Sequence, residues 1–141
     1  MSDETRRSVR LERVQRGSYR VENARGGTLT TGEGADEHFS PVELLLAAIG
    51  ACTASDVDYI TSRRAEPTGF EIAVDGDKIA GEAGNVMENL RVTFAISFPP
   101  GDAGDTAREF LPRAVKRSHD RLCTVSRTVE RGTPIATVID G

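Results

Sequence analysis

The feature that most constrains this chain is an apolar helix with a clearly marked start. Ser40 is a favoured N-cap residue, Pro41 suits the first helical position, and Glu43 stands three residues after the cap, as in a capping box. Residues 44–51 are then apolar almost without interruption. Because this run is apolar around much of the helix, we do not expect one monomer surface to cover it. The pattern therefore predicts a central helix, ending near Arg64, in an obligate homodimer.

Hydrophobic periodicity and Gly or Pro breaks predict the other elements. Alternating apolar and polar residues indicate two half-buried antiparallel strands at 70–75 and 90–98. An apolar stripe indicates a second helix that opens at Asp105, with Pro112 as a kink or a late start. Further expected elements are strands at 9–14, 19–21 and 28–31, a short helix after Cys123 that runs through Arg131, and a last strand at 135–139. This order predicts an α+β fold with helices packed on antiparallel sheets, as a single domain over residues 1–141.

The two cysteines are the clearest candidates for chemistry. Cys52 lies deep in the apolar helix, whereas Cys123 lies at a charged helix boundary. If the fold brings the sulfurs together, one thiolate can attack an oxidant and the other can resolve the product as a disulfide, without a metal or an organic cofactor. The alternative is a pair of inert core thiols, because cysteine is among the most buried residue types.

Composition excludes several classes of function. Lys and Arg number 18 against 22 Asp and Glu, for a formal charge of −4 with the charges interspersed, so neither nucleic acid nor an anionic membrane is an expected partner. The longest apolar stretch, 44–51, is far short of the ~20 residues that cross a bilayer, and the first residues carry no apolar export segment. We expect a cytoplasmic protein, in which a structural disulfide would be unusual. A zinc site from both cysteines, His38 and His119 lacks close ligand pairs, so no metal is expected.

Two segments resemble the signature sequences of the OsmC/Ohr family of peroxide-reducing proteins. They are residues 40–57, around Cys52, and residues 121–126, around Cys123. Length, cysteine spacing and order of elements agree over nearly the whole chain. The chain departs from the Ohr pattern at Val42 and at 124–125, so it is closer to the OsmC-like branch.

The resemblance implies both an assembly and an activity. The assembly is an intertwined homodimer in which antiparallel sheets wrap around central helices, with one cysteine pair per active site near the interface. The activity is thiol-dependent reduction of organic hydroperoxides, with Cys52 peroxidatic and Cys123 resolving. A dithiol, for example a lipoyl-protein, would recycle the disulfide.

Cys52 needs a positive charge to form its thiolate. It lies roughly twelve residues beyond the N-cap, whereas the helix dipole acts mainly within the first turn. The family supplies an arginine from the N-terminal strands, and the resemblance favours Arg16 by its spacing to the following turn, with Arg25 as the competing choice. The ordinary alternative for either residue is a solvated turn arginine.

Glu43 has two possible roles. Family peroxidases often carry a carboxylate at this helix start that pairs with the arginine, although in the Ohr branch it directly follows the proline, where this chain has Val42. Glu43 precedes Cys52 by nine residues, which is about 900° of rotation and ~13.5 Å on an ideal helix. Since it also completes the capping box, capping is favoured over catalysis, but both roles are compatible if an arginine bridges to Glu43.

Cys123 has possible activators of its own. It precedes a short helix and is flanked by Arg121 and Arg127, which favour a thiolate. His119 lies four residues earlier and could act as a base or as a hydrogen-bond partner of Cys123. The favoured interpretation is a surface histidine beside Asp120.

Three classes of function fit these residues. The leading hypothesis is a cysteine-based hydroperoxide reductase. The second is a binding protein that holds a small hydrophobic ligand in an apolar pocket, and the third is a redox sensor whose disulfide changes conformation without turnover.

Overall fold

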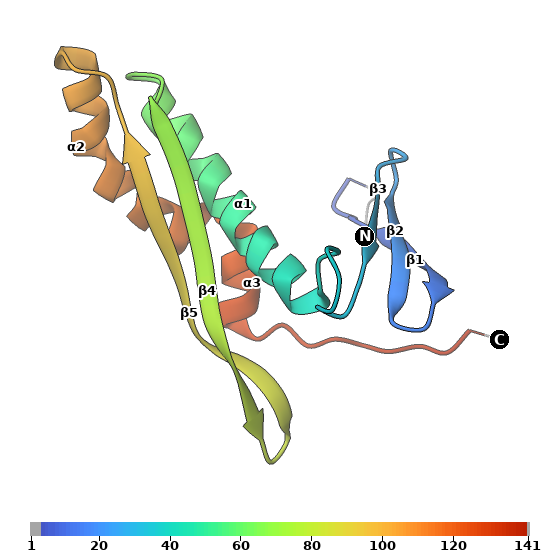
Figure 1. Ribbon diagram of the computed structural model, residues 1–141. Coiled ribbons are helices and arrows are strands. Elements are labelled where there is room, and N and C mark those ends of the chain that lie inside the picture. Colours follow the sequence, from blue (N-terminus) through green and yellow to red (C-terminus); the bar gives the residue numbers. More distant parts are fainter. Residues whose placement is uncertain (1–3, 141) are drawn as a thin grey trace. The chain divides into compact units, whose positions relative to one another are not determined.

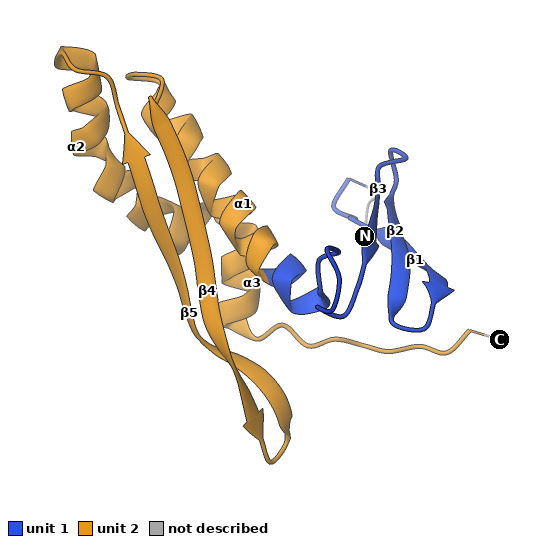
Figure 2. Ribbon diagram, viewed as in Figure 1, with its two compact units in different colours: residues 1–45 blue, residues 46–141 orange. Residues whose placement is uncertain are grey.

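The computed structural model describes residues 4–140 of the 141-residue chain. The chain divides into two compact units, residues 1–45 and residues 46–141 (Figure 2). Strands, helices and antiparallel pairing in both units confirm the predicted α+β class.

The first unit contains an antiparallel sheet in the order β1-β2-β3 (Figure 1). Its strands are β1 (Val9–Gln15), β2 (Ser18–Asn23) and β3 (Thr28–Thr31), as the sequence predicted. Asn23 shapes the second turn, because its Oδ1 accepts hydrogen bonds from the backbone N–H groups of Arg25 and Gly27 at 2.9 and 3.0 Å. Every residue of β1 is exposed, including its three apolar residues Val9, Leu11 and Val14.

Helix α1 (Pro41–Ser62) begins with the predicted capping box. The Glu43 N–H donates to Ser40 Oγ at 3.2 Å, and the Ser40 N–H donates to Glu43 Oε1 at 2.9 Å. The helix begins at the predicted Pro41 and ends at Ser62, two residues before the predicted Arg64.

The second unit is built on the long hairpin of β4 (Gly69–Gly81) and β5 (Gly84–Ser97). Its strands lie along α1 in Figure 1. Gly50 is buried at this packing, and a Cβ atom there would come within 2.9 Å of Val74 Cγ2. A glycine at position 50 thus allows the helix and β4 to approach closely.

Three helical segments follow the hairpin. Helix α2 (Asp102–Arg117) starts three residues before the predicted Asp105 and continues through Pro112, so the late start is wrong. A π-turn, η1 (Ser118–Leu122), is closed by the Cys123 N–H, which donates to the Ser118 carbonyl at 2.8 Å. Helix α3 (Thr124–Arg131) ends as predicted at Gly132, whose φ of 68° is left-handed.

The predicted last strand at 135–139 is wrong for this single chain. Residues 133–140 form no regular secondary structure, and Ile135, Val138 and Ile139 are 88%, 87% and 97% exposed. Alternation alone does not make a strand, because a strand also needs a neighbouring edge for its N–H and C=O groups. Within residues 4–140 this segment has no such neighbour.

Helix α1 is also the candidate for a membrane span among the described residues. Its 22 residues include an 18-residue window of mean hydropathy 1.3, of which 28% is buried. Length and composition alone support this interpretation, and the core helix of a soluble protein passes the same test. It is weak evidence for a membrane location.

Candidate active site

The two cysteines, far apart in sequence, come together in the second unit. The Sγ atoms of Cys52 and Cys123 and a carboxylate oxygen of Asp56 all lie within 4.8 Å of one another. Both thiols are free; Cys52 is half-buried and Cys123 is fully buried. The predicted juxtaposition of the sulfurs is therefore confirmed.

Cys123 is the N-cap residue of α3, and its sulfur has several hydrogen-bond partners. The Ser126 N–H donates to Sγ at 3.4 Å, the Ser126 hydroxyl lies 3.1 Å from it, and the Thr53 hydroxyl donates to it at 3.5 Å. Burial raises the pKa of Cys123, but these hydrogen bonds outweigh burial and lower its pKa below the ordinary value. The start of α3 thus provides a backbone N–H to the Cys123 sulfur.

Cys52 has the opposite balance. Burial raises its pKa, the backbone N–H of Val125 lowers it, and the adjacent Cys123 sulfur raises it again, so the net shift is upward. The Thr124 N–H also lowers the pKa. The first-turn amides of α3 therefore act on Cys52, an effect that its distance from the start of its own helix did not reveal.

Asp56 is the site residue that the sequence interpretation missed. It follows Cys52 by one helical turn on α1, so the two side chains share a face. The buried Ser118 of the π-turn fixes it, donating from Oγ to Asp56 Oδ2 at 2.8 Å. The spacing of four residues was the available signal.

His119 is the surface residue that the sequence favoured. Its Nδ1 lies 2.9 Å from Asp120, its Nε2 lies 2.8 Å from Glu130, and its side chain is 60% exposed. The hydrogen bonds to Asp120 and Glu130 raise the pKa of His119. With both ring nitrogens paired to carboxylates, His119 is not a base for Cys123.

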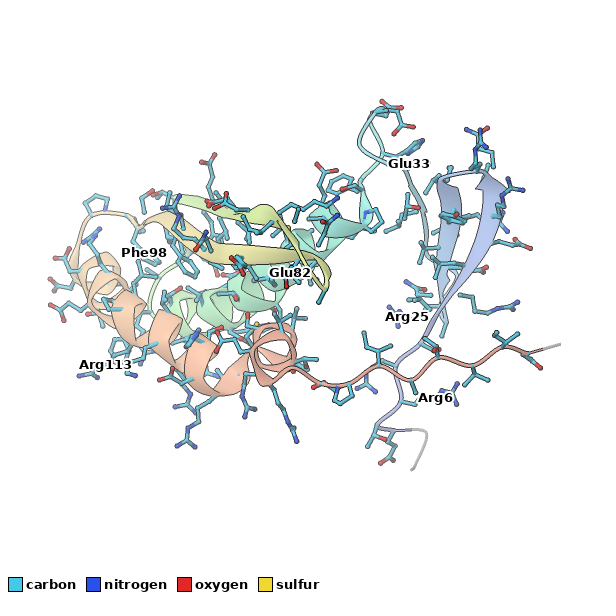
Figure 3. All side chains as sticks on the ribbon, turned by 90° about the horizontal axis from the view of Figure 1, so that it is seen from below. Arg6, Arg25, Glu33, Glu82, Phe98 and Arg113 are labelled. Atoms are coloured by element: carbon cyan, nitrogen blue, oxygen red, sulfur yellow. The ribbon has the colours of Figure 1, made fainter. Side chains whose placement is uncertain are left out.

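Arg16, Arg25 and Glu43 belong to the first unit. Arg16 lies in the β1–β2 turn and Arg25 in the β2–β3 turn, where it is labelled in Figure 3. Both are exposed, and neither guanidinium forms a hydrogen bond or ion pair with another described residue. Glu43 makes the capping contacts at the start of α1. Their part in thiol chemistry stays a prediction.

An apolar cavity of about 260 Å³ lies beside Cys123. Thr53 and Ser126 form part of its wall and also contact the Cys123 sulfur. The other lining residues come mainly from the sheet and from the helices that face it: Ile49, Val74, Leu90, Val92, Phe94, Val115, His119, Val129 and Glu130. Neither cysteine lines the cavity, which adjoins the Cys123 sulfur through Thr53 and Ser126.

Comparison with known proteins gives one family and several structural neighbours. The model of the family described as OsmC-like protein matches residues 34–138. No curated protein matches the chain.

The structural neighbours cover nearly the whole chain. A hypothetical protein from Aquifex aeolicus has a TM-score of 0.71 and 24% identity, over 91% of this chain and 89% of that one. An OsmC-like protein from Mycoplasma pneumoniae has a TM-score of 0.68 and 14% identity, over 90% and 89%. The organic hydroperoxide resistance protein OhrB of Bacillus subtilis has a TM-score of 0.55 and 18% identity, over 89% and 91%. At these identities the likeness shows a shared fold.

Proposed function

The chain belongs to the OsmC-like protein family, and on this premise we propose that it is a thiol-dependent peroxidase that reduces organic hydroperoxides. The observation that carries the proposal is the convergence of both thiols at the first turn of α3, with sulfurs within 4.8 Å. Two thiols so placed supply the two electrons that reduction of one peroxide requires.

The proposed cycle begins at Cys52, because Cys52 is half-buried whereas Cys123 is buried. The Cys52 thiolate attacks a peroxide oxygen, the O–O bond breaks, and the alcohol leaves after it gains a proton. The Cys123 thiolate then attacks the resulting Cys52 sulfenic acid, so that an S–S bond forms and water leaves. A dithiol, for example a lipoyl-protein, reduces the disulfide by exchange and restores both thiols. A cytoplasmic location fits this supply of reductant.

The raised pKa of Cys52 means that the first step needs a cation. We assign this role to Arg16, with Arg25 as the competing candidate. An arginine keeps its charge even when buried, so it can stabilise a thiolate where lysine could be neutralised. Glu43 is the proposed partner of that guanidinium, in addition to its capping role.

The homodimer is part of the proposal. Exposed apolar residues along β1, the largely unburied α1 and the exposed segment 133–140 all favour a second copy as their cover. We propose that residues 1–141 act as one OsmC-like domain within an intertwined dimer. Light scattering at micromolar concentration should give twice 15.2 kDa, and a particle of 15.2 kDa would overturn the dimer.

The apolar cavity favours one alternative, a non-catalytic protein that binds a small hydrophobic ligand. Under the main proposal the same cavity accepts the organic group of the peroxide. A peroxide assay with excess dithiol separates the classes. Sustained loss of cumene hydroperoxide supports the enzyme, consumption of one equivalent supports a redox sensor, and no consumption supports the binding protein.

A further inference from the structure

We propose that the reduced protein binds a thiophilic divalent cation, such as Zn²⁺, through Cys52 Sγ, Cys123 Sγ and a carboxylate oxygen of Asp56. All three ligand atoms lie within 4.8 Å of one another. In a tetrahedral zinc site with Zn–S near 2.3 Å and Zn–O near 2.1 Å, neighbouring ligand atoms are about 3.5–3.8 Å apart. Side-chain rotations that shorten the separations by about 1 Å are enough to close the site on an ion.

The three ligands come from a preformed arrangement. Cys52 and Asp56 project from one face of α1 at a spacing of four residues, and Cys123 approaches from the boundary between η1 and α3. Ser118 donates to Asp56 Oδ2 and so orients the carboxylate, as an outer partner of a metal ligand does. A carboxylate has a second oxygen to offer the ion.

Charge also favours a cation at this position. Three groups that ionise to anions converge there, and within residues 4–140 no lysine, arginine or histidine forms an ion pair with Asp56. A divalent cation that replaces two thiol protons leaves the metal with two thiolates and one carboxylate, and two protons go to solvent. Soft thiolate ligands select zinc-like metals over magnesium or calcium.

The site is open, which distinguishes it from a structural zinc site. Three protein ligands leave a fourth position for water, and Cys52 and Asp56 are both half-buried, so an ion can enter and leave. Metal binding and peroxide reduction require the same sulfurs. If the proposed peroxidase cycle holds, a bound cation therefore blocks it, and formation of the disulfide releases the cation.

Anaerobic titration of the reduced protein with Co²⁺ tests the site directly. We expect one equivalent per chain, with near-ultraviolet thiolate charge-transfer absorption and the visible bands of four-coordinate cobalt, both removed by Zn²⁺. Asp56→Asn should weaken Co²⁺ binding by about tenfold or more while charge-transfer absorption persists at saturation. Asp58→Asn is the matched control, because Asp58 is exposed on the same helix, and it should bind as the wild type does.

Absence of charge-transfer absorption in the wild type would overturn the proposal, as would equal Co²⁺ affinity in Asp56→Asn and the wild type. Ser118→Ala provides an independent variant if Asp56→Asn does not fold, because it retains all three ligands and should still weaken binding. Unchanged affinity in that variant counts against the site. The titration contains no peroxide, so its result does not depend on the proposed peroxidase cycle. If the protein binds Co²⁺ but consumes no cumene hydroperoxide in the separate assay, only the peroxidase proposal is overturned.

Discussion

The first turn of α3 and the middle of α1 each hold one cysteine, and they affect its thiol in opposite ways. At the start of α3, Cys123 is buried, yet the hydrogen bonds of Ser126 and Thr53 lower its pKa. In the middle of α1, Cys52 is more accessible, yet its pKa is raised, with burial as the largest cause. Accessibility and acidity are thus separated between the two thiols.

The difference in pKa follows from the hydrogen-bond partners of each sulfur. N–H groups in the first turn have no carbonyl partner within the helix, so they can donate to a sulfur, whereas those in the middle are already bonded. Both sulfurs are affected by N–H groups of the first turn of α3, Cys123 by that of Ser126 and Cys52 by those of Val125 and Thr124. Cys123 also contacts the hydroxyls of Ser126 and Thr53, which lower its pKa. The lowered pKa of Cys123 therefore depends on the two hydroxyls beside its sulfur as well as on its position at the start of a helix.

This comparison bears on the order of the catalytic steps. A resolving thiol needs to ionise next to a sulfenic acid and has little need of access to solvent, which describes Cys123. A peroxidatic thiol must meet substrate, which describes Cys52, but it then depends on a cation. The first step at Cys52 therefore depends both on access for the peroxide and on a cation that stabilises the thiolate.

The largest effect should come from replacing the cysteines one at a time. Cys52→Ser should abolish reaction with cumene hydroperoxide, because serine is no comparable nucleophile at neutral pH. Cys123→Ser should retain the first step, so that Cys52 accumulates as sulfenic acid and then as sulfinic and sulfonic acids. Intact-mass measurement after a small excess of peroxide distinguishes these products.

The wild type is the control for that measurement, since it should lose two hydrogens as an intramolecular disulfide forms. Oxidation of Cys52→Ser together with an inert Cys123→Ser would invert the two roles and make acidity, not access, decisive. If neither thiol of the wild type reacts, the cysteines are core residues and the result supports the alternative function, a protein that binds a small hydrophobic ligand.

The next largest effect concerns the arginine proposed to stabilise the Cys52 thiolate. Arg16→Ala should slow peroxide consumption by about ten- to a hundredfold, because each 1.4 kcal/mol of lost transition-state stabilisation is a factor of ten. It should also raise the pKa of Cys52 further. Arg25→Ala is the matched control and should have less effect on both. Reversed effects assign the role to Arg25, and two silent variants remove the arginine mechanism.

Much of the fold could be predicted because it depends on local patterns. The capping box at Ser40 and Glu43 fixes the start of α1, and Gly132 marks the end of α3. The strand at 135–139 failed because a strand depends on a pairing edge that no local pattern reveals. By helical spacing Leu122 would continue the apolar stripe of the second helix, but the π-turn changes the helical period there and leaves Leu122 39% exposed.

Only the part of the site that depends on local sequence patterns could be predicted. The N-terminal position of Cys123 on a helix could be read from nearby residues. The approach of the α3 amides to Cys52, and the hydrogen bond from Ser118 to Asp56, join segments 60 or more residues apart. Only the packing of the helices in the second unit brings these groups together, and a single sequence does not encode that packing in any local pattern.

A smaller effect is expected for the pKa of Cys123. Ser126→Ala removes the hydroxyl beside the Cys123 sulfur, so the pKa of Cys123 should rise. In a Cys52→Ser background, thiolate absorbance measured against pH should shift upward, and the thiolate fraction at neutral pH should fall about two- to tenfold, as expected for one lost hydrogen bond. Ser126→Thr keeps the hydroxyl and should change little. An unchanged titration in Ser126→Ala would leave the backbone N–H as the main cause.

The smallest effect separates the two roles of Glu43. Glu43→Gln keeps a side-chain oxygen for the Ser40 N–H but removes the charge that would hold the arginine. Because an exposed ion pair contributes only about 0.2–1 kcal/mol, the peroxidase rate should fall by about 1.5- to 5-fold while the melting temperature stays unchanged. Ser40→Ala is the complementary control: loss of the cap should cost about 0.5–2 kcal/mol of stability and leave the rate nearly unaltered below the melting transition. A Glu43→Gln rate equal to that of the wild type, with Ser40→Ala destabilised as expected, would assign Glu43 to capping alone and leave the charge balance of Cys52 to the arginine.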